Sequence, residues 1–219
     1  MNYNSSINFN IPLDQKTVFS YFIFKMEIGQ FFFISFEGIK ADKTLLSFLN
    51  KIKPGGIIFF TRNIITPKQT YELIKKIVNE LDYCPFLGID LEGEKVNRLK
   101  NIFPPLPSFS DLGKIKNHKM IQKHAELSAR AMEIFGFNVN FSPVIDLDFG
   151  YQNGLETRTL GREPELVTSL AKIYLKTFER FKILTTLKHF PGLGRAKFDT
   201  HFYLPTIETS LSELEKEDL

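Results

Sequence analysis

The sequence predicts an α/β protein built on a parallel sheet, and two observations carry this prediction. Short apolar runs alternate with longer stretches of helical period, which is the pattern of repeated βα units. The apolar runs are nearly continuous, as expected of parallel strands that are covered on both faces. With 219 residues, 43% of them hydrophobic, the chain is long enough to form one domain with a substantial core.

The apolar runs are the predicted strands. In chain order they are QFFFISF (30–36), GGIIFF (55–60), PFLGID (85–90), NVNFSPV (138–144) and ILTTLKHF (183–190). We therefore expect residues 26–219 to form the folded domain and residues 1–25 to be an N-terminal extension. The apolar stretch 17–24 has no clean cleavage site after it, so a signal peptide is not expected.

Two helices are predicted between these strands, because apolar residues recur there on one helical face. The first face contains Tyr71, Ile74, Val78 and Leu81, and the second contains Leu166, Leu170, Ile173, Thr177 and Phe181. Pro67 and Pro164 lie near the two helix starts, where the missing amide proton is tolerated.

Two architectures fit these repeats. A closed (β/α)8 barrel typically takes about 250 residues. An open, doubly wound sheet of five strands would be complete within 219 residues. Both architectures place ligands at the C-terminal ends of the strands, so polar residues at those ends are the candidates for a site.

The composition argues against several classes of protein. The 28 basic and 25 acidic residues are spread along the chain, and a net charge of +3 creates no field suited to nucleic acid or an anionic membrane. No stretch approaches the roughly 20 apolar residues that span a bilayer. The single cysteine, Cys84, excludes a disulfide framework within the chain and is compatible with a reducing compartment. We therefore expect a cytoplasmic protein.

Polar side chains follow four of the five predicted strands, and the candidate binding residues follow the third and the fifth. Asp90 ends the third strand and Arg98 lies in the loop after it, while Lys188 and His189 end the fifth. A lysine at the end of an apolar strand needs acceptors, because burial without them disfavours its charged form. Sugar hydroxyls both donate and accept hydrogen bonds, so this set of side chains is suited to bind a sugar ring.

Other polar residues are interpreted as structural. Arg62, Asp146 and Asp148 are read as caps, turns or solvated loop residues, because loops are generally polar. His118 and His124 lie in a lysine-rich stretch and are expected to be solvated.

An aspartate and a histidine two residues apart are the candidate catalytic pair. Pro191, Gly192 and Gly194 indicate a flexible loop after the fifth strand, and this loop carries Asp199 and His201. Histidine has an ordinary pKa of about 6.5, so it can donate and accept a proton near neutral pH. Asp199 would orient the imidazole and stabilise its cation, as the carboxylate of a catalytic triad does. The pair is therefore predicted to be a general acid/base on a loop that closes over the substrate.

Three other interpretations of this loop remain open. An Asp-Thr-His surface turn without function is one. A zinc site built from His189, Asp199 and His201 is a second, although the spacing lacks the usual zinc pattern. A phosphate-binding loop is the third, although the Gly-Lys-Ser/Thr ending is absent.

Several longer motifs run through most of the chain. They are GQFFFISFEG, PGGIIFFTRNI, GIDLEGEKVNRL, FPPLPS, FGFNVNFSPVIDLD, TRTLGREPELV and KHFPGLGRAKFDTHFYLP. With them the sequence resembles glycoside hydrolase family 3, and within it the bacterial β-N-acetylglucosaminidases that trim muropeptides during cell-wall recycling. The last motif, with Lys-His, Pro-Gly and then Asp-Thr-His, is the most specific part of the resemblance.

The resemblance implies a fold, a reaction and a role for each matching residue. The fold would be a (β/α)8 TIM barrel, ended here after about five βα units. The reaction would be retaining hydrolysis of terminal β-linked N-acetylglucosamine from a muropeptide or chito-oligosaccharide, without a metal or organic cofactor. His201 would be the acid/base with Asp199 as its partner, and the sugar ring would be held by Asp90, Arg98, Arg158, Lys188 and His189.

The chain departs from the family pattern at two places. The family's Asp-Gln-Glu-Gly-Gly-Arg is DLEGEK here, with Glu94 and Lys95 in place of a glycine and an arginine. The family's nucleophilic aspartate lies beyond the acid/base loop, and no residue of this chain matches it, although Asp146 or Asp148 stays open as a substitute. Two alternatives to the hydrolase therefore stay open: a non-catalytic N-acetylglucosamine-binding remnant of the barrel, and a phosphate-binding open α/β domain.

Overall fold

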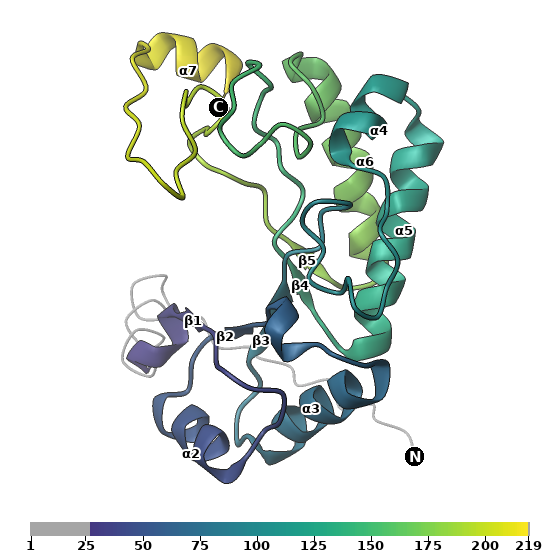
Figure 1. Ribbon diagram of the computed structural model, residues 1–219, viewed down its shortest axis with the longest axis vertical. Coiled ribbons are helices and arrows are strands. Elements are labelled where there is room, and N and C mark those ends of the chain that lie inside the picture. The colour runs from purple at the N-terminus through teal and green to yellow at the C-terminus, as the bar shows by residue number, and fades with distance from the viewer. Residues whose placement is uncertain (1–26, 219) are drawn as a thin grey trace, which may run out of the picture.

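The computed structural model describes residues 27–218 and contains one sheet of five parallel strands (Figure 1). The strands are β1 (Phe33–Ile34), β2 (Gly56–Ile58), β3 (Phe86–Ile89), β4 (Val139–Asn140) and β5 (Leu184–Thr185). The predicted α/β class with a parallel sheet is confirmed. The predicted extension 1–25 lies outside the described residues.

The order of the strands decides between the two predicted architectures. Neighbouring strands follow the chain order β1-β2-β3-β4-β5, and every neighbouring pair is parallel. A doubly wound sheet reverses its strand order at a switch point, so that alternative is wrong. Consecutive parallel strands joined by helices are the arrangement of a TIM barrel.

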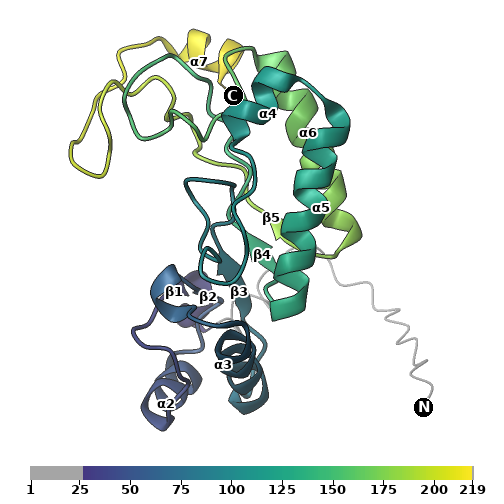
Figure 2. The ribbon, with the colours of Figure 1, turned by 45° about the vertical axis from the view of Figure 1, so that its right-hand side comes forward.

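The helices follow the same repeat along the chain. They are η1 (Ile28–Phe31), α2 (Lys43–Ile52), η2 (Thr61–Asn63), α3 (Pro67–Glu80), α4 (Phe109–Ile115), α5 (His118–Phe135), α6 (Pro164–Arg180) and α7 (Leu211–Glu217). The long helices α2, α3, α5 and α6 lie along the outside of the strands in chain order (Figures 1 and 2). None of the helices between residues 27 and 218 combines the length and apolar character needed to cross a bilayer.

Local sequence signals set where these helices begin. Pro67 and Pro164 are the first residues of α3 and α6, as predicted. The Thr66 side chain accepts a hydrogen bond from the amide of Gln69, and Asn117 caps the start of α5 in the same way. These caps satisfy amide groups that have no partner within the first turn of a helix.

The buried face of α3 differs from the predicted one. Tyr71 and Val78 are each 50% exposed, whereas Leu73, Ile74 and Ile77 are buried. The predicted face was therefore wrong at two of its four positions. Periodicity alone locates an apolar stripe, but packing against the sheet and α5 decides which part of the stripe is covered.

His124 is buried, so the prediction that it is solvated was wrong. It is 3% exposed and lies against the rings of Phe109 and Tyr174, with ring centroids 5.4 and 6.1 Å away. Along α5, Ile121 and Ala125 share its buried face, whereas Lys123 is exposed. Of the lysines that suggested solvation, Lys119 and Lys123 are exposed on the same helix, whereas Lys114 and Lys116 lie at the end of α4.

Burial of His124 is expected to make stability depend on pH. Burial lowers its pKa from 6.5 to about 4, although the Pro107 carbonyl opposes the shift. As the pH falls, His124 is protonated in the unfolded chain before it is protonated in the folded chain. The contribution of neutral His124 to the free energy of unfolding is therefore complete above pH 6.5 and declines as the pH falls toward 4. From the free energy per pKa unit, we expect a loss of about 3 kcal/mol.

His124→Leu is expected to remove most of this acid-side decline. The measurement is urea unfolding of both proteins at neutral pH and near pH 4.5. His118→Leu is the control, because His118 is exposed at the start of the same helix. An equal decline in wild type and His124→Leu would contradict the assignment.

Candidate active site

Side chains from the C-terminal ends of β3, β4 and β5 meet in one cavity of about 460 Å³. Its lining includes every predicted site residue: Asp90, Arg98, Arg158, Lys188, His189, Asp199 and His201. Glu92, Lys95 and Asn153 line it as well and were not among the predicted site residues.

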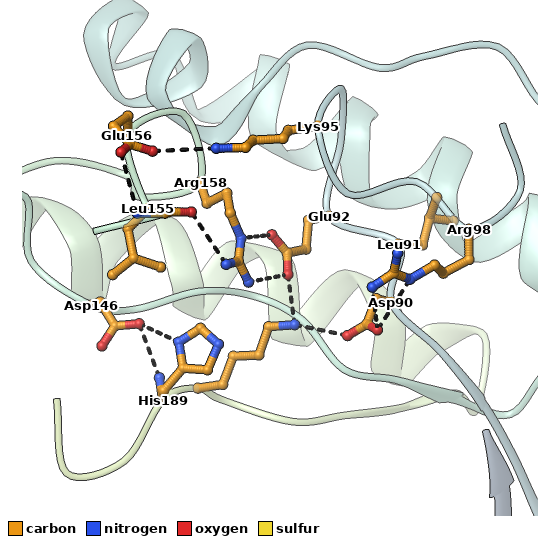
Figure 3. A network of polar contacts seen from close by, with 12 residues as sticks. Asp90, Leu91, Glu92, Lys95, Arg98, Asp146, Leu155, Glu156, Arg158 and His189 are labelled. Carbon is orange, nitrogen blue, oxygen red and sulfur yellow. Dashed lines mark hydrogen bonds and ion pairs between the residues drawn. The ribbon is translucent and has the colours of Figure 1, made fainter. Parts of the chain in front are cut away.

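An ion network centred on Glu92 forms the floor of this site (Figure 3). The Lys188 Nζ lies 2.6 Å from Glu92 Oε1 and 2.9 Å from Asp90 Oδ1. Arg158 donates two hydrogen bonds to the Glu92 carboxylate, from Nε at 2.8 Å and from Nη2 at 2.9 Å. Arg98 lies farther out, with Nε and Nη2 each 3.4 Å from Asp90 Oδ2.

The network is largely buried, which explains why it contains alternating charges. The side chains of Glu92, Arg158 and Lys188 are 3%, 12% and 13% exposed. Burial by itself lowers the pKa of Arg158, but hydrogen bonds from its guanidinium to Glu92 and the charges of Asp90 and Asp146 raise it above its ordinary value. Arg158 therefore stays charged, and each buried charge has a partner, as burial requires.

Backbone pairing of β4 with both β3 and β5 brings Lys188, from the β5 end of the sheet, to Asp90 at the end of β3. The pairing continues past the named strands through a parallel bridge between Val144 and Lys188. The loop after β3 turns back on itself through an antiparallel bridge between Leu91 and Asn97, which brings Arg98 next to Asp90. The sites of both ion pairs thus follow from backbone pairing.

His189 is paired with Asp146 in a second acid–imidazole contact. The Nδ1 of His189 lies 2.6 Å from Asp146 Oδ2, and the same carboxylate accepts the backbone N–H groups of His189 and Leu193. With Nδ1 donating to Asp146, the Nε2 of His189 is the nitrogen left for a ligand. Asp146 was interpreted mainly as a cap, turn or loop residue, so its contact with the His189 ring was missed.

The other two residues interpreted as structural behave as expected. Asp148 accepts the backbone N–H of Gly150 in a tight turn. Arg62 lies at the surface, where it contacts Glu37 and Ser35.

Asp199 and His201 form the predicted pair. The Nδ1 of His201 lies 2.6 Å from Asp199 Oδ1, which also accepts the backbone N–H of His201 at 2.9 Å. Both hydrogen bonds lower the pKa of Asp199, and the one from the backbone N–H of His201 has the larger effect. The carboxylate therefore stays ionised at neutral pH beside the imidazole. The His201 side chain is 74% exposed, so its Nε2 can reach a ligand.

The loop that carries this pair is fastened by residues that the sequence analysis missed. The amide of buried Asn153 donates to the carbonyl oxygens of Gly194 and Ala196, at 3.2 and 2.9 Å. Gly154 has a φ of +87°, and a Cβ atom there would lie 2.9 Å from Asp199 Oδ2. Glycine is therefore required at 154 for both conformation and space. No local signal in the sequence connects these positions.

The zinc interpretation needs His189, Asp199 and His201 around one ion. Within residues 27–218, the structure brings no three His, Cys, Asp or Glu side chains into a group that could hold a metal. The two histidines are instead paired with different carboxylates, Asp146 and Asp199.

Comparison with known families and proteins gives a consistent result. The pattern that defines the glycosyl hydrolase family 3 N-terminal domain matches residues 23–219. A β-hexosaminidase of Nitrosospira multiformis is 31% identical over 172 residues, which are 75% of this chain and 49% of that protein. A β-hexosaminidase of Pseudomonas aeruginosa is 33% identical over 169 residues, again 75% of this chain and 50% of that protein. The chain spans about half the length of the curated relatives it matches.

Solved structures show the same likeness. A family 3 β-N-acetylglucosaminidase from a Paenibacillus species superimposes with a TM-score of 0.83 and 28% identity, over 88% of this chain and 38% of that chain. NagZ from Neisseria gonorrhoeae, in complex with N-trifluoroacetyl-D-glucosamine, superimposes with a TM-score of 0.80 and 28% identity, over 85% of this chain and 57% of that chain.

Proposed function

This chain belongs to glycosyl hydrolase family 3, and from that premise we propose that it forms the sugar-binding and acid/base part of a β-N-acetylhexosaminidase. The reaction is retaining hydrolysis of terminal β-linked N-acetylglucosamine, of the muropeptide type that serves cell-wall recycling. The main support is that the Asp199–His201 pair and the ion network line one cavity at the C-terminal ends of the strands. That end of the sheet is where TIM-barrel enzymes carry their active sites.

In this proposal His201 transfers the protons. Its Nδ1 is bound to Asp199, so Nε2 donates a proton to the glycosidic oxygen as the bond to the aglycone breaks. In the second step the same nitrogen takes a proton from the water that attacks the glycosyl-enzyme intermediate. The ionised Asp199 stabilises the imidazolium form of His201 that exists before donation.

The sugar ring is held by Asp90, Arg98, Arg158, Lys188 and His189. The carboxylate of Asp90 and the Nε2 of His189 accept hydrogen bonds, whereas Arg158 and Lys188 donate them. A neutral sugar suits a cavity in which the charges are already paired with each other. Glu92 acts through Lys188 and Arg158 by fixing the positions of their donor atoms.

A retaining mechanism also needs a nucleophilic carboxylate, about 5 to 5.5 Å from the acid/base group in the usual two-carboxylate arrangement. Among residues 27–218, the candidate carboxylates near the site are already engaged. Asp90 and Glu92 bind cations, Asp199 binds His201, and Asp146 binds His189 and two backbone amides. We therefore place the nucleophile outside the described residues.

The same observation favours a second function. A cavity with the five proposed sugar contacts, and with no free carboxylate among residues 27–218 to act as nucleophile, is suited to bind N-acetylglucosamine without hydrolysing it. The two functions predict the same affinity for the sugar and differ only in turnover. Release of N-acetylglucosamine from an aryl β-glycoside, with the β-anomer seen first by NMR, would support the retaining hydrolase.

Arg158→Met is expected to weaken N-acetylglucosamine binding about 10- to 100-fold, because a charged hydrogen bond to the ligand contributes about 1.5–3 kcal/mol. Affinity is measured by NMR titration at a temperature where the variant is folded. Arg180→Met is the matched control, since Arg180 also pairs with a glutamate but lies at the surface with its side chain 56% exposed. Equal affinity in the two folded variants would remove Arg158 from the site, and no binding by the wild type would overturn the proposed function.

A further inference from the structure

Asn140, the last residue of β4, is completely buried behind the ion network. Its side-chain amide makes two hydrogen bonds with the backbone of one residue, Leu91. The Oδ1 accepts the Leu91 N–H at 3.0 Å, and the Nδ2 donates to the Leu91 carbonyl at 3.0 Å. We infer that Asn140 is a positioning residue that holds the two carboxylates of the site, Asp90 and Glu92, at their spacing. This inference deepens the proposed function and rests on it for the identity of the ligand.

The two bonds replace backbone pairing at the point where it stops. The ladder between β3 and β4 ends with the pair Ile89 and Asn140, and the Phe141 amide makes its last bond to the Ile89 carbonyl. Leu91 lies beyond that point and is 1% exposed, so water cannot replace the missing partner. The side-chain amide of Asn140 supplies a donor and an acceptor side by side there. Among neutral side chains, an amide is the group that carries an N–H donor and a carbonyl acceptor on the same carbon.

The position of Leu91 determines where both neighbouring carboxylates point. Residues on either side of an extended residue face the same way, so Asp90 and Glu92 face the cavity while the Leu91 side chain enters the core. Both carboxylates contact the same ammonium group, Lys188 Nζ, at 2.9 and 2.6 Å. A rotation of the Leu91 peptide groups would therefore move both carboxylates, and with them their contacts to Lys188, Arg158 and Arg98 (Figure 3).

A tyrosine from α6 also contacts the Asn140 amide. The hydroxyl of Tyr174 lies 3.1 Å from Asn140 Nδ2, and Tyr174 is fully buried. A flipped amide would face the Leu91 N–H with Nδ2 and the Leu91 carbonyl with Oδ1, so it would lose both bonds to Leu91. The Tyr174 hydroxyl can accept or donate, so it supports the buried amide while the Leu91 backbone sets its orientation.

The test compares Asn140→Leu with Asn63→Leu. Asn63 is also completely buried and also bridges separate backbone segments, donating to the carbonyls of Phe36 and Gly38, but it does not line the cavity. Both variants should lose stability to a similar degree. We expect only Asn140→Leu to raise the Kd for N-acetylglucosamine, by at least about tenfold, with Asn63→Leu within about twofold of wild type. Wild-type affinity in folded Asn140→Leu would overturn the inference.

A second measurement decides the inference without a ligand. Amide hydrogen exchange at Leu91, whose N–H donates to Asn140 Oδ1, should be at least about tenfold faster in Asn140→Leu and unchanged in Asn63→Leu, because a lost hydrogen bond frees the amide. Unchanged exchange would overturn the positioning role even if the wild type failed to bind the sugar, an outcome that would count against the proposed function alone. If Asn140→Leu does not fold, Asn140→Ala, which removes both hydrogen bonds to Leu91 without adding a larger side chain, is measured in its place, and the same results are expected of it.

Discussion

His201→Ala is expected to slow cleavage of N-acetylglucosaminides with poor leaving groups about 10²- to 10⁴-fold, the usual contribution of a general acid. The reason is that Nε2 of His201 is the atom proposed to protonate the departing oxygen, held by Asp199 at 2.6 Å from Nδ1. The measurement is kcat/KM for alkyl and aryl glycosides in a polypeptide that contains this domain together with the nucleophile.

The leaving group provides the control for this prediction. An aryl glycoside with a highly acidic phenol needs little protonation, so its bond cleavage should be slowed far less by His201→Ala. Asp199→Asn should show the same selectivity, because the neutral amide cannot stabilise the imidazolium. The contacts with His201 lower the pKa of Asp199. In the wild type, Asp199 should therefore stop stabilising the His201 imidazolium only at acid pH, below the ordinary range of an aspartate pKa. A loss that is equal for good and poor leaving groups would argue against proton donation by His201.

Glu92→Gln is expected to lower the free energy of unfolding by about 3–5 kcal/mol, because removing one member of a buried ion network leaves its partners without compensation. Glu92 is 2% exposed and forms ion pairs with both Lys188 and Arg158. The variant should also bind N-acetylglucosamine more weakly, since both donors lose their fixed positions. Urea unfolding and a sugar titration of the same protein measure the two effects.

Glu156→Gln is the matched control for Glu92→Gln. Glu156 pairs with Lys95 at 3.3 Å in the same region, but the two side chains are 41% and 52% exposed. An exposed ion pair contributes about 0–1 kcal/mol, so this variant should unfold almost as the wild type does. Similar losses in both variants would mean that burial of the Glu92 network is not what stabilises it.

Most of the candidate site residues could be predicted because they follow apolar strands. Asp90, Lys188 and His189 come directly at strand ends, and any parallel α/β sheet gathers such residues at one edge. Asp199 and His201 were found from their spacing on a glycine-rich loop. Arg158 has no such local signal and was predicted only from the family resemblance.

The residues that were missed act through partners far away in the chain. Glu92 binds Arg158, 66 positions later, and Asn140 clamps Leu91, 49 positions earlier. Asn153 holds carbonyl groups about forty residues downstream, at separations of 41 and 43. A buried asparagine and one in a surface loop look the same in the sequence, because nothing local records which backbone groups lack partners.

The sequence by itself determined the repeated βα pattern, the helix starts at Pro67 and Pro164, and the polar strand ends, since periodicity and capping depend on residues within a few positions of one another. Only the tertiary structure decided the strand order, the burial of His124 and the exposure of Tyr71 and Val78. These features depend on which surfaces meet after the chain has folded. Contacts of that kind join residues that are distant in sequence, so the free energy that selects them comes from packing and desolvation across the whole domain.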